Sequence, residues 1–229
     1  MPALELHQVS KVFGTGHTMV EAMKTTDFTA EHGELIGVVG PSGSGKSTFL
    51  TIAGGLQTPS HGDVVINGYT LTTFKEKKRS RIRLNEIGFV LQSSNLVPFL
   101  TVDQQMQLLD KVKGKNLSSD KLREVYQSLG IENLRNTYPS ELSGGEQQRA
   151  AIAKALYSDP SILLADEPTA SLDTNRAFEV MEMFHDLTKK RNKTTIVVTH
   201  DTRLLDYFDK VYTITDGEIH LEQQKAVNH

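Results

Sequence analysis

The chain has 229 residues, of which 38% are hydrophobic, and its 25 basic and 28 acidic side chains give a net charge of −3. This length suits one α/β domain, and the longest apolar stretches are strand-sized, far short of the ~20 residues that span a bilayer. The absence of cysteine excludes disulfides and thiolate metal sites. Because there is no basic excess and no secretory signal, we expect a cytosolic protein that binds no nucleic acid.

The first third of the chain predicts short strands. Residues 4–9 alternate, residues 19–29 are interpreted as a hairpin, and the apolar run 35–39 is interpreted as a buried strand. A helix is expected from Gly45 to about Gly54, then a strand at 63–66 that stops at a turn, Asn67-Gly68.

The basic run at residues 75–83 predicts a solvated helix face, with contact to lipid headgroups or to a membrane partner as the alternative. A strand is expected at 87–91. Residues 101–157 then have helical patterns, broken at 113–116 and at Pro139.

After residue 157, strands and helices alternate. We expect strands at 161–165 and 194–199, helices at 174–190 and 202–208, and a closing hairpin that turns at residues 216 and 217. Buried strands alternating with helices indicate a mostly parallel sheet with crossover helices, so the predicted fold class is α/β. The helical middle of the chain is expected to be an insertion into this core.

A glycine-rich segment directly follows the apolar strand that ends at Val39. It has the pattern G-x-x-x-x-G-K-[ST] between a strand and a helix, in the residues Gly40, Pro41, Ser42, Gly43, Ser44, Gly45, Lys46, Ser47 and Thr48. Glycine lets successive backbone N–H groups point at phosphate oxygens, and the start of the next helix adds its partial positive charge. We therefore predict a nucleotide site in which Lys46 contacts the β- and γ-phosphates and Ser47 binds Mg²⁺.

Two acidic residues end the strand at 161–165. Asp166 and Glu167 lie where ligands of parallel sheets bind, beyond the carboxyl ends of the strands. We expect Asp166 to hold Mg²⁺ and Glu167 to orient the water that attacks the γ-phosphate. Exposed acids at a strand-to-loop transition are the simpler interpretation of this pair alone, and the upstream phosphate motif makes it less favoured.

The segment Leu142-Ser143-Gly144-Gly145-Glu146-Gln147-Gln148-Arg149 resembles the signature sequence of ABC ATPases, and it stands about twenty residues before the acidic pair, as that family requires. Other family marks follow in the family's order. Gln92 matches the Gln loop, residues 171–173 (Ser-Leu-Asp) match the D-loop, and His200 matches the switch histidine. Phe13 stands where the family places an aromatic residue against adenine, with Phe where Tyr is common.

This resemblance spans essentially the whole chain. It implies a RecA-like P-loop core with an N-terminal antiparallel β subdomain at residues 1–92 and 158–229, and a helical subdomain at 93–157 that carries the signature. It also implies ATP and Mg²⁺ as cofactors. The ATP is expected to lie between the phosphate loop of one copy and the signature of a second copy.

Residue roles follow from the same resemblance. The resemblance implies Glu167 as general base, with Lys46, His200 and Gln92 as further catalytic residues and Gln92 also on Mg²⁺. The ATP contacts that it implies outside the phosphate loop are Phe13, Ser143, Gly144, Gly145, Glu146 and Asp173.

Three classes of protein share parts of this pattern. A P-loop kinase or GTPase lacks the signature, and soluble ABC ATPases of DNA repair or translation carry a long coiled-coil insertion or two tandem modules. Only 51 positions separate Gln92 from Ser143, as in the compact insert of transporters. We therefore expect a subunit that drives a separate membrane permease.

Within transporters, residues 40–56, 87–92 and 164–169 are similar to the macrolide-exporter and lipoprotein-release group. That resemblance implies a four-helix permease with a large extracytoplasmic domain. Residues 92–100 and 172–177 resemble the haem-exporter ATPase subunits of Gram-positive bacteria. Haem efflux at the inner face of the plasma membrane is the function this implies, and export of antimicrobial peptides, macrolides or lipoproteins is the alternative.

Overall fold

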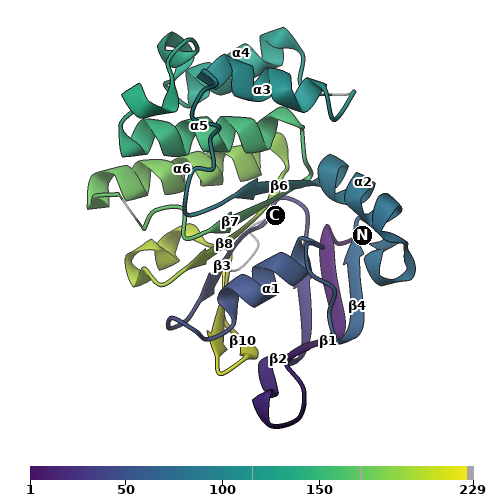
Figure 1. Cartoon of the computed structure of the whole chain (residues 1–229). Helices are drawn as coiled ribbons and strands as arrows, with labels where there is room; N and C mark the ends of the chain where they lie inside the picture. The colour runs from purple at the N-terminus through teal and green to yellow at the C-terminus, as the bar shows by residue number, and fades with distance from the viewer. Residues whose placement is uncertain (115, 171, 226–229) are drawn as a thin grey trace.

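The computed structural model describes residues 1–114, 116–170 and 172–225. Two sheets form its framework (Figure 1). The smaller sheet is antiparallel, in the order β2-β1-β4-β5, and it consists of β1 (Leu4–Phe13), β2 (Val20–Ala30), β4 (His61–Ile66) and β5 (Tyr69–Thr70).

The larger sheet has the order β10-β9-β3-β8-β7-β6. Its strands are β3 (Leu35–Val39), β6 (Ile87–Val90), β7 (Ile162–Asp166), β8 (Thr194–Thr199), β9 (Lys210–Thr215) and β10 (Glu218–Gln224). Every neighbouring pair is parallel except β9 and β10, which form the closing hairpin. The strands β3, β7 and β8 are nearly fully buried and have apolar centres, as expected for a parallel sheet covered on both faces.

Helices cover both faces of the larger sheet. The α-helices are α1 (Lys46–Ala53), α2 (Glu76–Glu86), α3 (Val102–Asp110), α4 (Ser119–Ser128), α5 (Gly144–Tyr157) and α6 (Thr174–Arg191). Short 3₁₀ segments are η1 (Gly16–Thr18), η2 (Leu71–Thr73), η3 (Glu132–Leu134), η4 (Pro139–Glu141) and η5 (Thr202–Tyr207). In Figure 1 the helices α3, α4 and α5 lie together at one end of the molecule, above the sheet.

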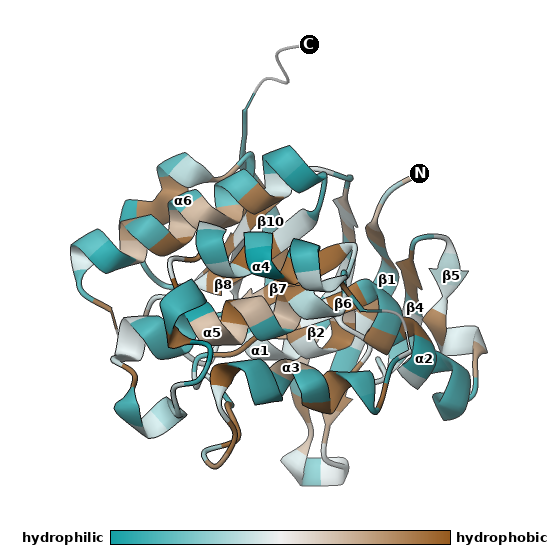
Figure 2. Cartoon of the chain, turned by 90° about the horizontal axis from the view of Figure 1, so that it is seen from above, coloured by the Kyte–Doolittle hydropathy of each residue, from teal (hydrophilic) through white to brown (hydrophobic). Residues whose placement is uncertain are grey.

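Two hydrophobic clusters hold these layers together. One packs α1 between the antiparallel sheet and one face of the larger sheet, with Phe49 and Phe28 in contact at a ring-centroid distance of 5.0 Å. The other joins the opposite face of the larger sheet to α3, α4, α5 and α6. Figure 2 shows hydrophilic residues dominating α2 and α4 and alternating with hydrophobic ones along α6, as expected for helices with one solvated face.

Two expectations from the sequence differ from the structure. The hairpin predicted at residues 19–29 is wrong, because this stretch is one strand, β2, which pairs with β1 from Leu4↔Ala30 to Phe13↔Val20. The chain reverses earlier, where Gly14 and Gly16 have φ of +76° and +58° beside η1. The helix predicted at 202–208 is the 3₁₀ segment η5, one short stretch rather than an α-helix.

The remaining predicted elements are confirmed with small shifts of their ends. Asn67 and Gly68 form the turn between β4 and β5, both with positive φ. In the described part of the chain, no helix combines the length and apolar character needed to cross a bilayer. The division into domains at residues 92 and 158 stays a prediction, and one hydrophobic cluster contains residues from both sides of each boundary.

Candidate functional site

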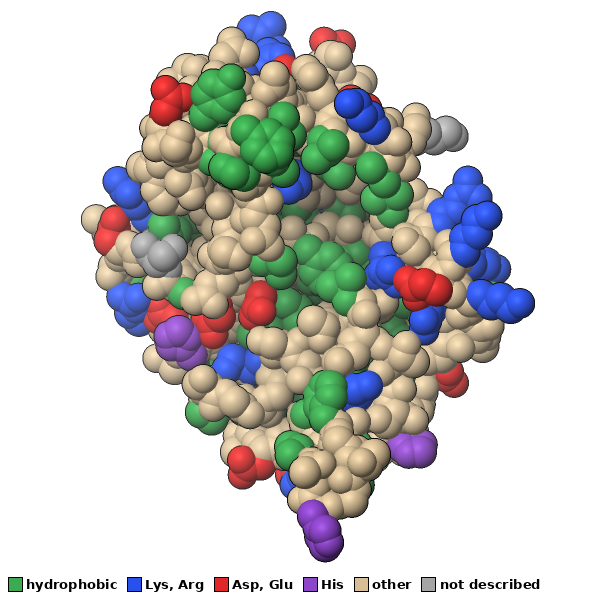
Figure 3. Space-filling model, viewed as in Figure 1, with side chains coloured by type: hydrophobic (Ala, Val, Ile, Leu, Met, Phe, Trp, Pro, Cys, Tyr) green, Lys and Arg blue, Asp and Glu red, His purple; other side chains and the backbone are tan. Residues whose placement is uncertain are grey.

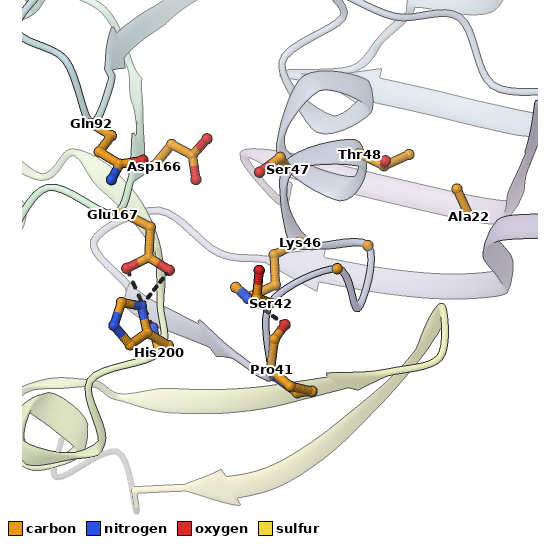
Figure 4. A pocket seen from close by; sticks show the side chains of 12 residues that line it. Ala22, Pro41, Ser42, Lys46, Ser47, Thr48, Gln92, Asp166, Glu167 and His200 are labelled. Carbon is orange, nitrogen blue, oxygen red and sulfur yellow. Dashed lines mark hydrogen bonds and ion pairs between the residues drawn. The ribbon is translucent and has the colours of Figure 1, made fainter. Parts of the chain in front are cut away.

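A cavity of about 670 Å³ opens at the carboxyl ends of β3, β7 and β8, beside the start of α1. Ten of the residues around it are labelled in Figure 4. It is lined by Ala22, Pro41, Ser42, Gly43, Gly45, Lys46, Ser47, Thr48, Gln92, Asp166, Glu167 and His200. The structure therefore brings together residues from five separate parts of the sequence, and all but Ala22 are predicted site residues.

The start of α1 is open to an anion. Its N-cap residue is Gly45, which has a left-handed conformation with φ of +107° and offers no side-chain cap. A Cβ at Gly45 would lie 2.5 Å from the carbonyl oxygen of Ala22, so no larger residue fits here. Since no side chain caps this helix start, its first N–H groups and their partial positive charge face the cavity.

Lys46 supplies a full positive charge at the same helix start. Its side chain is only 8% exposed, and its Nζ donates to the carbonyl oxygens of Gly40 at 2.8 Å and Pro41 at 2.7 Å. No carboxylate pairs with Lys46 among the described residues. A cation held by neutral carbonyls keeps its charge available for phosphate oxygens.

Across the cavity, Glu167 and His200 form a pair. The Glu167 Oε1 lies 2.9 Å from His200 Nδ1, and the backbone N–H of His200 donates to Glu167 Oε2 at 3.4 Å. Figure 4 shows both side chains on the wall that faces the glycine-rich loop. Glu167 has φ of +46°, a conformation that costs a non-glycine residue about 1 kcal/mol or more, and its N–H is fixed by donating to Val198 O at 2.9 Å.

Asp166, Ser47 and Gln92 form the oxygen-rich side of the cavity. Figure 4 shows Gln92 and Asp166 next to each other, with Ser47 across from them at the start of α1. Burial raises the pKa of the Asp166 carboxyl above its usual range, with the nearby Glu167 charge acting in the same direction. A hydrogen bond from Ser47 and the charge of Lys46 oppose that rise.

These residues fit a hard cation that shares its shell with phosphate. A carboxylate, a hydroxyl and an amide oxygen are ligands that Mg²⁺ accepts, and Mg²⁺ usually keeps waters and substrate phosphates in its shell. Among residues 1–114, 116–170 and 172–225, no group of three or more His, Cys, Asp and Glu side chains is placed to hold a metal ion.

Six predicted nucleotide contacts lie away from the cavity. Phe13 ends β1 with 40% exposure, and the Lys11 Nζ lies 5.1 Å from its ring centroid. Asp173 caps α6, since its Oδ1 accepts from the N–H of Arg176 at 3.1 Å. Residues 143–146 form the start of α5.

At the start of α5, Ser143 and Glu146 form a capping box. Glu146 Oε2 accepts from the N–H and from the Oγ of Ser143, each at 2.7 Å, while Ser143 Oγ accepts from the N–H of Glu146 at 3.4 Å. These hydrogen bonds lower the pKa of the Glu146 carboxyl. Within this chain Glu146 therefore has a local role, and its nucleotide contact stays a prediction.

Four further residues belong to the site or to its predicted motifs. Gly40 and Ser44 belong to the loop without lining the cavity, because Ser44 is buried and a Cβ at Gly40 would meet Ile214 O at 2.2 Å. Ala22 of β2 lines the cavity, and no signal in the sequence singles it out. Ser171, part of the predicted D-loop, lies outside the described residues.

Comparison with known proteins gives concordant results. The sequence model of the family described as ABC transporter matches residues 23–170. The chain is 45% identical over 221 residues to a putative hemin import ATP-binding protein HrtA of Staphylococcus haemolyticus, covering 96% of this chain and 100% of that protein.

Solved structures agree with this similarity. A dimeric ATP-binding cassette, MJ0796, described as a post-hydrolysis state bound to ADP and Pi, superimposes with a TM-score of 0.86 at 34% identity, covering 97% of this chain and 99% of that one. The structure of cbiO1 from Clostridium perfringens, described as part of the ABC transporter complex cbiONQ, has a TM-score of 0.84 at 27% identity over 96% of this chain and 87% of that one.

Proposed function

This chain belongs to the ABC transporter family and is an ATP-binding subunit with ATPase activity, and from that premise we propose that two copies close over two ATP molecules to drive an export permease. One observation carries the proposal. The uncapped start of α1, the cation Lys46 and the pair Glu167–His200 face one another across a single cavity. This arrangement has a phosphate site on one side and a base on the other.

The residues of α1 and its loop bind the triphosphate in this proposal. The Lys46 Nζ exchanges its two loop carbonyls for β- and γ-phosphate oxygens, which adds a charge-assisted contact without moving the helix. The N–H groups at the start of α1 contact the same oxygens. Phe13 packs against the adenine ring, for which its 40% exposure leaves a free face.

Ser47, Asp166 and Gln92 would hold Mg²⁺. When bound, the ion would neutralise charge on the β- and γ-phosphates. Asp166 contributes the carboxylate, and its raised pKa reflects a burial that the charge of a cation would offset. Gln92 follows β6, so it connects this side of the cavity to the helical part of the chain.

Glu167 is placed to activate water. As its carboxylate takes a proton, the water oxygen bonds to the γ-phosphorus and the bond from phosphorus to the bridging oxygen breaks, which releases ADP and phosphate. His200 fixes the direction of that carboxylate through the 2.9 Å contact. Its other ring nitrogen is then free to contact the γ-phosphate.

Glu167→Gln tests this assignment. The amide cannot act as base, so ATP turnover is expected to fall by roughly 10²–10⁴-fold while ATP affinity stays close to that of the wild type. Glu179→Gln, an exposed change on α6, is the matched control and should leave turnover unchanged. Undiminished hydrolysis in Glu167→Gln would remove Glu167 from the role of base.

The second copy supplies the other half of the site. We propose that Ser143, Gly144 and Gly145 of one copy contact the γ-phosphate held by the loop of the other, with Glu146 and Asp173 beside them. Support comes from their position, since none of these residues lines the cavity of its own chain. The similar cassette MJ0796 is described as dimeric and bound to ADP and Pi, which supports a working unit of two copies.

Haem is the proposed cargo, and export is the proposed direction. The cargo rests on the 45% identity to a protein named for hemin. That name says import, whereas residues 40–56 and 164–169 are similar to the exporter group, and we follow the exporter resemblance. The permease would be a separate four-helix protein with a large extracytoplasmic domain, and the chain would lie on the cytoplasmic face of the plasma membrane of a Gram-positive bacterium.

Deletion of the gene together with a neighbouring permease gene tests cargo and direction. Export of haem predicts haem accumulation and selective sensitivity to haem. Import predicts lower haem uptake and no added sensitivity. Sensitivity to bacitracin-like peptides or macrolides instead would replace haem by those cargoes.

A further inference from the structure

The helix α2 carries most of its cations on one outward face. Residues 75–86 contain six basic and two acidic residues, a net charge of +4 within a chain whose total is −3. Such a local excess in an acidic chain needs its own explanation, because solubility alone does not require one sign of charge to gather on one helix.

Two of these cations have a structural role. Arg79 and Arg83 both pair with Glu76 at 2.7 Å, and they also donate to groups beyond α1, Arg79 to Thr58 Oγ1 at 2.8 Å and Arg83 to Gly55 O at 2.9 Å. These contacts lower the pKa of the Glu76 carboxyl, with Arg83 the larger cause. This inward set fixes α2 to the core.

The other cations face outward. Lys77, Lys78 and Arg81 are exposed and have no acidic partner within salt-bridge distance in the described part of the chain. Their spacing places them within about 100° of one another around the helix axis, on the side opposite Arg79 and Arg83. The Nζ of Lys78 lies over the ring of Phe74, 3.5 Å from the ring centroid. We call Lys77, Lys78 and Arg81 the basic face.

The basic face lies at the rim of the molecule. Figure 3 shows blue side chains gathered on the side that carries α2 in Figure 1, next to a hollow with hydrophobic side chains. Leu84 of α2 and Phe89 of β6 line a hollow of about 240 Å³. None of the exposed large hydrophobic side chains belongs to α2 itself. The helix therefore offers charge to a partner and no apolar anchor.

We propose that the basic face binds the anionic phospholipid headgroups of the membrane that holds the permease. Charge complementarity supports lipid over an acidic protein. Two of the three cations are Lys ammonium groups on flexible stems, which suit a diffuse negative surface better than one shaped carboxylate site. Because no apolar anchor accompanies them, adsorption is electrostatic and occurs at headgroup depth. The proposal extends the proposed function, since it concerns how this subunit meets its membrane.

Vesicle binding of the full chain tests the proposal. The chain is sedimented with vesicles of phosphatidylglycerol and phosphatidylcholine in equal parts, and with pure phosphatidylcholine. We expect binding to the anionic vesicles only, and its loss when salt rises from about 0.1 M to about 0.5 M. Each basic side chain near an anionic surface raises the affinity roughly fivefold. The triple variant that combines Lys77→Gln, Lys78→Gln and Arg81→Gln should therefore bind at least tenfold more weakly.

The control variant removes the same charge elsewhere. This second triple variant combines Lys121→Gln, Arg123→Gln and Lys190→Gln. It changes three exposed cations of α4 and α6 and should keep wild-type binding. Glutamine favours helix in both variants, and circular dichroism checks their folding. Basal ATPase activity without vesicles should be unchanged in both, which separates a failure here from a failure of the proposed function.

Several outcomes would overturn the proposal. Equal binding to neutral vesicles, salt-insensitive binding, or equal losses in the two triple variants would each contradict a specific basic face. Absence of vesicle binding, together with loss of permease-stimulated ATPase activity in the basic-face variant, would assign the face to an acidic surface of the permease instead.

Discussion

The starts of α1 and α5 look alike in the sequence, since each has Ser and Gly residues at its start and each is predicted to bind phosphate. In the structure they differ. The start of α1 has no side-chain cap and lies beside a buried cation and a cavity. The start of α5 is closed by the capping box of Ser143 and Glu146, which already places a carboxylate at the positive end of the helix.

The difference shows which half of the site one copy completes. An anion at α1 finds uncapped N–H groups and the charge of Lys46 without competition. An anion at the start of α5 meets the negative charge of Glu146. It avoids that charge only if it is presented by another molecule and contacts Ser143 or the glycine backbone. We therefore propose that the α1 site is the primary nucleotide site and that the α5 site contributes once ATP is presented by a second copy.

Among changes at the two helix starts, the largest effect is expected from removing the α1 cation. Lys46→Met keeps the length of the side chain and deletes its charge, so ATP turnover should fall by roughly 10²–10³-fold, with weaker ATP binding. Steady-state hydrolysis and nucleotide titration measure both. Lys121→Met, an exposed change on α4, is the control. Normal ATP binding and hydrolysis by Lys46→Met would contradict the claim that the start of α1 is the primary nucleotide site.

A pH series probes the metal side of the α1 site. Burial raises the pKa of Asp166. On acidification this carboxyl therefore gains its proton at a higher pH than an ordinary Asp, whose pKa is near 3.9. Below that pKa, Mg²⁺-dependent ATP binding should weaken by about tenfold per pH unit, because only the carboxylate binds the ion. Asp166→Asn should bind Mg-ATP more weakly and without this pH dependence. Identical pH profiles would contradict the assignment of Asp166.

At α5 a moderate effect on stability is expected. Ser143→Ala removes the capping hydroxyl and should cost about 1 kcal/mol of unfolding free energy. In a domain of this size, that corresponds to a fall in Tm of about 2–4 °C. ATP binding by a single copy should not change. Weaker ATP binding by the isolated copy would show that α5 belongs to the primary site.

The smallest effect is expected for Glu146→Gln. The amide can still accept from Ser143, so only the charge at the helix start is lost, worth about 0.3–1 kcal/mol. Thermal unfolding of this variant and of Ser143→Ala, measured together, separates charge from capping. A larger loss in Glu146→Gln than in Ser143→Ala would mean that the carboxylate does more than cap α5.

Much of this fold could be predicted because its signals are local. The strand 35–39, the glycine-rich loop and α1 follow from a buried apolar run and a turn that needs glycine. The contact of Glu167 with His200 depends on β7 and β8 being neighbours in the sheet, which the order of the elements alone does not specify. The resemblance of the motifs names both residues as catalytic.

Other features could not be predicted from local patterns. The local pattern of β2 predicts a hairpin, because the pairing of β2 with β1 is long-range and the chain reversal depends on glycines before it. Ala22 reaches the cavity only through that pairing. Residues 143 and 146 have the Ser-x-x-Glu spacing of a capping box, and the side-chain geometry shows that Glu146 does accept from Ser143.

The most direct test of the central claim is the molar mass in solution of the Glu167→Gln variant, measured by light scattering with and without saturating Mg-ATP. If each ATP is shared between the loop before α1 of one copy and the start of α5 of another, the mass should correspond to two copies with nucleotide and to one copy without it. A mass that remains that of one copy at saturating Mg-ATP would contradict the claim.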